Sequence, residues 1–161
     1  MRNLKLIIWS ILALYWQLLM PSKFMFADVI PNFLIPFIIF IHLRFELRYT
    51  LPVAFVLGLS LDLLQPAFLG LNTLAFLIIS FLVHHYHHPI NKKRLLIVIT
   101  SIFLLNLCYY GIFYIFQLLS GALTGEISQT YIWTLFYNTF LSFISIYLLI
   151  LIDKTKLSIH E

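Results

Sequence analysis

Charged residues are scarce in this sequence: Lys and Arg number 10 and Asp and Glu number 6, together 10% of 161 residues. A soluble globular domain carries about 25% charged residues, so this composition argues against one. The single cysteine, Cys108, excludes an intramolecular disulfide, and it lies in an apolar segment where a thiol behaves as a small hydrophobic group. The five glycines form no Gly-rich phosphate-binding loop, which gives no support to a nucleotide-binding enzyme.

Hydrophobic residues are abundant instead, at 62% of the chain with a mean hydropathy of +1.00. Six apolar segments approach the ~20 residues that a bilayer crossing requires. We therefore predict an all-α integral membrane protein, a single domain of residues 1–161 with six transmembrane helices in one bundle. The expected helices are residues 4–20, 29–43, 50–64, 69–83, 95–119 and 131–152. The second contains Pro31 and Pro36 and is expected to be kinked or broken. The first has no small-residue cleavage site after it, so we expect a retained helix.

The basic residues predict the orientation of these helices. Nine of the ten Lys and Arg residues fall on one side of the membrane in the six-helix arrangement, and only Lys23 falls on the other. Cytoplasmic loops retain an excess of Lys and Arg, so both termini are expected to be cytoplasmic. The net charge of +4 then serves topology and contact with anionic lipid, and we expect no nucleic-acid partner. The nine residues are Arg2, Lys5, Arg44, Arg48, Lys92, Lys93, Arg94, Lys154 and Lys156.

Asp62 is the only carboxylate within an apolar segment. An ionisable side chain at membrane depth is costly and marks a functional hypothesis by default. Gly58 precedes it by one helical turn on the same face, and Gly70 and Asn72 follow it across a short turn at the start of the next helix. Two interpretations stay open: Asp62 locks the hairpin of the third and fourth helices by accepting hydrogen bonds, or it handles a proton or ligand. We favour the lock, because no second titratable group accompanies Asp62 at depth.

Other polar residues give no catalytic site. Intramembrane hydrolysis needs a second Asp, a Ser with a His, or a His and Glu metal site at depth, and the apolar segments offer no such pair. His84 and His88 lie one helical turn apart and could share a metal ion, but no Cys or carboxylate lies close in sequence. We expect the cluster of His84, His85, His87 and His88 to be an interfacial helix end. Asn106, Gln117 and Asn138 are expected to form interhelical hydrogen bonds. We predict no enzyme, no cofactor and no metal.

The third and fourth segments resemble a known family. The run G-L-S-L-D-L-L of residues 58–64, followed by L-G-L-N-T-L of residues 69–74, resembles the G-x-x-x-D-L-L and L-G-x-x-x-L signature of the rod shape-determining protein MreD family. The prolines of the second segment and the basic turn before the third also resemble that family. The likeness is strong over about residues 29–83, and the remaining helices match in hydropathy and order.

This resemblance implies a non-catalytic scaffold subunit of the bacterial cell-wall elongation (rod) complex, in the cytoplasmic (inner) membrane. It implies MreC as the direct partner, and through it RodA, a penicillin-binding transpeptidase and MreB, in support of cell shape and peptidoglycan synthesis. Gly58, Asp62, Gly70 and Asn72 would form a structural or partner-coupling motif. The family fold also resembles the substrate-binding subunit of energy-coupling-factor vitamin transporters, which gives an alternative function. That alternative is weaker, because the first helix lacks the small-x-x-x-small spacing of such subunits and the outer loops are short.

Overall fold

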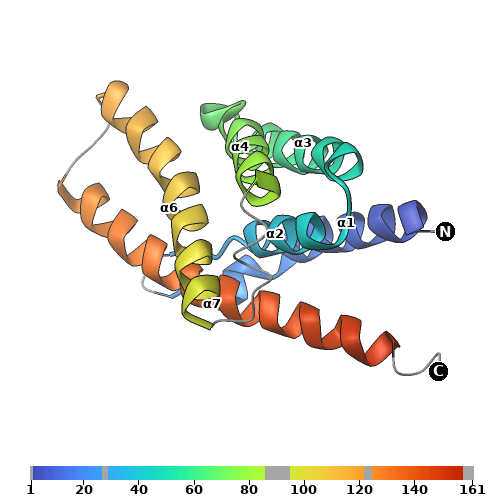
Figure 1. Cartoon of the computed structure of the whole chain (residues 1–161). Helices are drawn as coiled ribbons and strands as arrows, with labels where there is room; N and C mark the ends of the chain where they lie inside the picture. The colour runs from blue at the N-terminus through green and yellow to red at the C-terminus, as the bar shows by residue number, and fades with distance from the viewer. Residues whose placement is uncertain (1, 27–28, 86–94, 122–124, 158–161) are drawn as a thin grey trace.

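The computed structural model describes residues 2–26, 29–85, 95–121 and 125–157, and these residues fold into six α-helices without a β-strand (Figure 1). Two short 3-10 helices, η1 and η2, follow the first and third α-helices, and one isolated bridge joins Phe26 to Val29. The elements in chain order are α1 (Arg2–Leu19), η1 (Pro21–Phe24), α2 (Leu34–Arg44), α3 (Leu47–Leu64), η2 (Pro66–Phe68), α4 (Leu71–His85), α6 (Leu95–Leu119) and α7 (Gly125–Leu157).

Three of these helices contain segments that are long and apolar enough to cross a membrane: Leu47–Leu64 in α3, Val98–Leu119 in α6 and Gln129–Leu151 in α7. The helices α1, α2 and α4 are apolar but shorter. The 11 residues of α2 extend about 16 Å, roughly half of a ~30 Å hydrocarbon core. The predicted all-helical membrane protein is therefore confirmed, whereas six complete membrane spans stay a prediction.

The start of α2 corrects the second predicted helix, which we expected over residues 29–43. The helix begins at Leu34 instead, because side chains of α1 and α7 bond the backbone of residues 31–33 in a non-helical conformation. The side chain of Asn32 accepts a hydrogen bond from the Leu34 N–H at 3.0 Å. Pro36 is tolerated because it lies in the first turn of α2, where its missing N–H would have no partner in the helix.

Other boundaries differ by smaller amounts. The helix expected over residues 50–64 begins at Leu47, and the one expected over residues 69–83 spans Leu71–His85. The last helix, expected over residues 131–152, runs from Gly125 to Leu157 and includes part of the expected outer loop. The helix expected over residues 95–119 has these same bounds in the structure.

The short α2 forms the centre of the molecule. It contacts α1, α3, α4 and α7. A helix that is apolar on all sides is typical of a buried position, and this explains why so short an element lies inside the bundle. Eight of its 11 residues are buried, namely Leu34, Ile35, Pro36, Phe37, Ile38, Ile39, Ile41 and His42.

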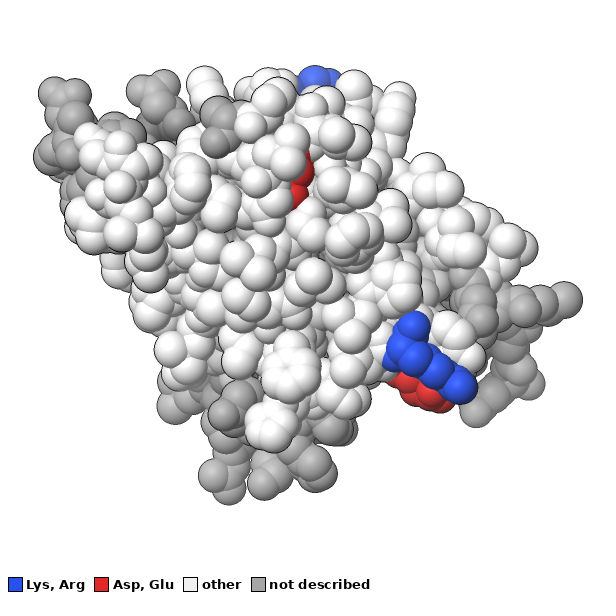
Figure 2. Space-filling model, turned by 90° about the horizontal axis from the view of Figure 1, so that it is seen from above, with Lys and Arg blue, Asp and Glu red and all other residues white. Residues whose placement is uncertain are grey.

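The outer surface is apolar, as expected for contact with lipid. Figure 2 shows a face on which Lys, Arg, Asp and Glu are almost absent. Large apolar side chains on the described surface, such as Leu4, Ile11 and Phe140, are more than 60% exposed.

The start of α1, the end of α7 and the turn between α2 and α3 lie on the same side of the molecule in Figure 1. Arg48, in the first turn of α3, pairs with Glu46 of the turn before it at 2.8 Å. Lys92, Lys93 and Arg94 lie outside the described residues.

Candidate functional site

The Asp62 carboxylate is fully buried and accepts four hydrogen bonds from the first turn of α4. Its Oδ1 accepts from the backbone N–H of Asn72 at 2.9 Å and from the Asn72 side-chain amide at 3.0 Å. Its Oδ2 accepts from the backbone N–H of Thr73 at 3.0 Å and from the Thr73 hydroxyl at 2.5 Å. The first N–H groups of a helix have no partner within the helix, and its dipole favours a negative charge there. Asp62 therefore ties the last turn of α3 to the first turn of α4.

Gly58 allows this contact by letting the two helices approach closely. A Cβ atom at residue 58 would lie 2.5 Å from the Thr73 Cα and 2.8 Å from the Thr73 backbone nitrogen, closer than Cβ atoms come to backbone. Glycine at this position thus brings the α4 backbone within reach of the Asp62 carboxylate one turn later. The structure places Gly58, Asp62 and Asn72 together.

Gly70 belongs to the turn that precedes α4 and has a different role. Its φ of +90° lies in the left-handed region, which glycine adopts without the strain that a Cβ brings. No atom lies within 4 Å of the position a Cβ would occupy, so the requirement is for backbone conformation and not for space. The Gly70 carbonyl accepts the Leu74 N–H at 2.9 Å, which begins the helix.

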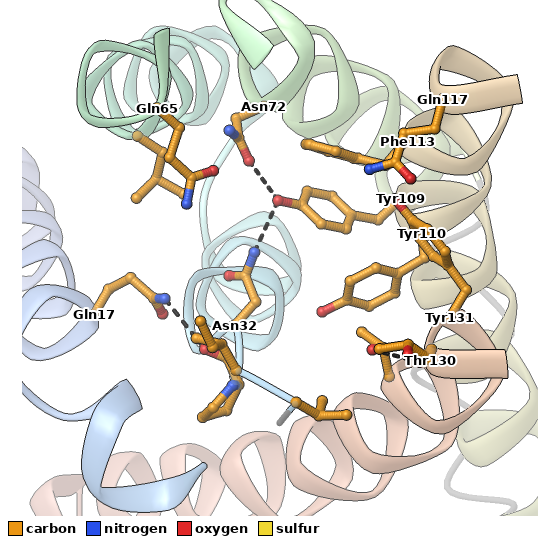
Figure 3. Close-up of a pocket in the computed structure, with 15 residues that line it drawn as sticks. Gln17, Asn32, Gln65, Asn72, Tyr109, Tyr110, Phe113, Gln117, Thr130 and Tyr131 are labelled. Carbon is orange, nitrogen blue, oxygen red and sulfur yellow. Dashed lines mark hydrogen bonds between the residues drawn. The ribbon is translucent and has the colours of Figure 1, made fainter. Parts of the chain in front are cut away.

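The hydrogen bonds continue from Asn72 to three further elements. The Tyr109 hydroxyl on α6 donates to Asn72 Oδ1 at 2.5 Å and accepts from the Asn32 side chain at 2.9 Å (Figure 3). The backbone N–H of Asn32, just before α2, donates to Asn138 Oδ1 on α7 at 2.7 Å. These residues, together with Asp62 and Thr73, are called the polar cluster below: Asn32, Asp62, Asn72, Thr73, Tyr109 and Asn138.

Gln17 attaches α1 to the same region. Its side-chain amide donates to the Pro31 carbonyl at 3.2 Å, and its Oε1 accepts from the Phe33 N–H at 2.6 Å. The non-helical backbone before α2 is thus bonded by side chains from α1 and α7. Backbone at membrane depth outside a helix needs such internal partners, since lipid supplies none.

The carboxylate of the polar cluster is saturated by hydrogen bonds within the protein. An ionised carboxylate offers about four accepting positions, and in Asp62 all four are used by donors of the protein. In the described residues no Lys, Arg or His bonds to this carboxylate. A carboxylate saturated in this way holds helices together and has no free position for a second partner.

Sequence reasoning missed Asn32, Thr73, Tyr109 and Gln17. Thr73 had a local signal, because a hydroxyl next to Asn72 in a first turn can donate to the same carboxylate. The Tyr109 ring stacks on Phe76, with centroids 5.5 Å apart, and its hydroxyl joins three segments. The partner of Tyr109, Asn32, is 77 residues away, so only the folded arrangement reveals the contact.

The other polar residues singled out in the sequence have separate surroundings. Asn106 bonds across helices as expected, to the Ser142 hydroxyl at 3.4 Å, whereas Asn138 bonds to the non-helical backbone of Asn32. The Oε1 of Gln117 is buried without a partner among the described residues. His84 and His85 end α4, whereas His87 and His88 lie outside the described residues. Within the described ranges no three His, Cys, Asp or Glu side chains are grouped to hold a metal.

A cavity of about 410 Å³ adjoins the polar cluster (Figure 3). Asn32, Asn72 and Tyr109 belong to both. The cavity lies where α1, α3 and α6 end and where α4 and α7 begin. Its remaining lining comes from Gln17, Val29, Ile30, Pro31, Leu61, Gln65, Tyr110, Phe113, Gln117, Thr130, Tyr131 and Thr134.

Comparison with known proteins places the chain in a family. A family model described as rod shape-determining protein MreD matches residues 1–154, far beyond the segment in which the motif lies. No curated protein and no solved structure matches the chain. Because the family match covers nearly all of the 161 residues, this chain belongs to the MreD family of rod shape-determining membrane proteins.

Proposed function

We propose that this protein is a non-catalytic scaffold of the bacterial cell-wall elongation complex, which binds MreC and thereby supports cell shape and peptidoglycan synthesis. The MreD family acts in rod shape determination together with other Mre proteins and is not a known enzyme family. The observation that carries the proposal is the saturation of Asp62. The single carboxylate within an apolar segment is used to join helices, as a scaffold requires.

The same proposal includes the place of the protein in the cell. We expect a multi-pass protein of the cytoplasmic (inner) membrane with both termini in the cytoplasm. Support comes from the nine-to-one division of basic residues. The start of α1 and the end of α7 also lie on one side of the molecule (Figure 1).

In this proposal Gly58, Asp62, Gly70 and Asn72 couple to partners through shape. They fix the hairpin of α3 and α4, so that the outward surfaces of these helices keep one arrangement for MreC to bind. RodA, the penicillin-binding transpeptidase and MreB would then be reached through MreC. The matching family model describes rod shape determination and gives no support to the vitamin-transporter alternative.

Affinity isolation in mild detergent tests the proposal. The full chain carries a tag, and a tagged unrelated membrane protein of similar size, expressed at the same level, is the control. We expect MreC to be enriched strongly over the control, with RodA, the transpeptidase and MreB recovered in smaller amounts and lost when MreC is depleted. Enrichment of coupling ATPases without any Mre protein would contradict the scaffold assignment.

A further inference from the structure

The cavity beside the polar cluster has the size of a small-molecule site. Its volume of about 410 Å³ falls within the range of roughly 300 to 1,000 Å³ that is usual for ligand pockets. It is built by residues from α1, α3, α4, α6 and α7 and by the backbone before α2. The polar cluster forms one wall, so the shape of the cavity is fixed by the same hydrogen bonds that hold the bundle (Figure 3).

The lining is polar but uncharged. Among the described residues that line the cavity there is no Asp, Glu, Lys, Arg or His, whereas amides, hydroxyls and aromatic rings are numerous. A charged ligand would therefore lose hydration without gaining an ionic partner, which is unfavourable. An anion would in addition face the Asp62 carboxylate, which lies directly behind Asn72.

One acceptor in this lining has no protein partner. The Oε1 of Gln117 is buried and forms no hydrogen bond with the described residues. A buried polar atom without a partner is unfavourable, so a donor from outside the chain is expected to satisfy it. Across the same space the Tyr110 hydroxyl points into the cavity (Figure 3). A ligand with several hydroxyl groups would meet both side chains.

From these observations we infer that the cavity binds an uncharged group bearing several hydroxyls, such as the sugar of a neutral glycolipid. Amide side chains can donate to and accept from hydroxyl groups, and the rings of Tyr110 and Tyr131 offer apolar contact to the C–H face of a sugar. The cavity lies at helix ends, the depth at which lipid head groups lie. Ile30 is 60% exposed and belongs to the lining, so an apolar surface continues from the cavity to the outside, where an acyl chain would lie.

Native mass spectrometry of the purified full chain tests this inference. The detergent must have no sugar head group, so that it does not compete. The probes are monoglucosyl-dioleoylglycerol and dioleoyl-phosphatidylglycerol, which share acyl chains and differ in head group, and free glucose, which lacks the lipid. We expect the glucosyl lipid to bind at least about tenfold more tightly than phosphatidylglycerol, because the anionic head group finds no cation in the lining.

Two variants and a control connect binding to the cavity. Gln117→Leu and Tyr110→Phe should each weaken binding of the glucosyl lipid roughly fivefold, the effect of one lost hydrogen bond. Thr139→Val removes another buried oxygen without a partner, but outside the cavity, and should leave binding unchanged. Size-exclusion chromatography shows that each variant is folded before it is measured.

The outcomes separate the sources of the ligand. Binding of the glucosyl lipid without binding of free glucose supports a lipid ligand. Equal binding of free glucose supports a soluble sugar in the same site. Equal binding of phosphatidylglycerol, or variants in Gln117 and Tyr110 that bind like Thr139→Val, would overturn the inference.

Discussion

At the scale of single residues, the four donors around Asp62 alter what a substitution is expected to do. Judged from the sequence alone, a structural lock predicts that Asp62→Asn is tolerated, because Asn keeps the shape and one acceptor. In the structure both carboxylate oxygens face donors, two from Asn72 and two from Thr73. An asparagine amide would direct its own donors at one of these pairs. The structure therefore predicts that Asn is destabilising, though less so than an apolar residue.

We expect a graded loss of stability in the series Asp62→Asn and Asp62→Leu. Leucine leaves all four donors of the first turn of α4 without an acceptor, and a buried donor left in this way costs about 1 to 3 kcal/mol of stability. Asparagine still accepts hydrogen bonds from one pair of these donors, but its amide N–H groups face the other pair. Thermal unfolding in detergent, followed by size-exclusion chromatography, measures the loss. Ser60→Ala is the control, since its hydroxyl bonds only to Val56 in its own helix. An Asp62→Leu protein as stable as Ser60→Ala would contradict the lock.

Tyr109→Phe tests the extension of the polar cluster to α6. The variant keeps the ring packing on Phe76 but removes the hydroxyl that Asn72 and Asn32 share. We expect a loss of about 1 to 2 kcal/mol in the free energy of unfolding, since the buried amide of Asn72 and the half-buried amide of Asn32 each lose a partner. Tyr147→Phe, on a side chain that is 58% exposed, should change little. Equal melting temperatures for the two variants would contradict the account.

How much of the site the sequence predicts depends on the distance between partners. Gly58, Asp62 and Asn72 lie within 15 residues of each other, and a glycine, a carboxylate and a helix start at helical spacing indicate their contact. Tyr109 and Asn138 are ordinary polar residues in long apolar helices. Their contact with Asn32 depends on how α6 and α7 pack, and helices that are apolar on all sides leave no stripe from which that packing can be read.

At the scale of the elements, the hairpin of α3 and α4 depends on close approach at Gly58. Gly58→Ala should destabilise the protein by about 1 to 3 kcal/mol, because its Cβ would overlap backbone of α4, which cannot move like a flexible side chain. Gly111→Ala is a matched control within α6, where no atom lies within 4 Å of the added Cβ, and it should be neutral or slightly stabilising. We expect Gly58→Ala to lower the melting temperature and Gly111→Ala to leave it unchanged or raise it slightly. A Gly58→Ala protein that melts like Gly111→Ala would contradict close packing of these helices.

The helices themselves were predictable to different degrees. Hydropathy locates α6 well, because a long apolar run between polar turns has clear ends. It fails at α2, where residues 29–33 are apolar except for Asn32 and are not helical. The backbone of residues 31–33 is bonded by the side chains of Gln17 and Asn138 instead. Hydropathy measures how apolar a segment is and carries no information about such side-chain partners.

At the scale of the whole molecule, the orientation in the membrane can be measured by cysteine labelling. Cys108→Ala first removes the single native thiol. A cysteine at Ser22 or Pro66, which are exposed at the ends of α1 and α3, should react with an impermeant maleimide applied to intact spheroplasts. A cysteine at Arg48, in the first turn of α3, should react only after permeabilisation. Labelling of position 48 from outside would contradict cytoplasmic termini.

The most direct test of a structural polar cluster in a scaffold is to plot rescue of rod shape against folded yield in a depletion strain. The variants are Asp62→Asn, Asp62→Leu, Tyr109→Phe and Gly58→Ala, with Ser60→Ala and Gly111→Ala as controls. If the polar cluster only holds the helices in place, rescue should follow the amount of folded protein along one curve for every variant. An Asp62→Asn protein that is folded at the level of the unmodified chain and yet fails to restore rod shape would contradict the account, because the charge of Asp62 would then act directly.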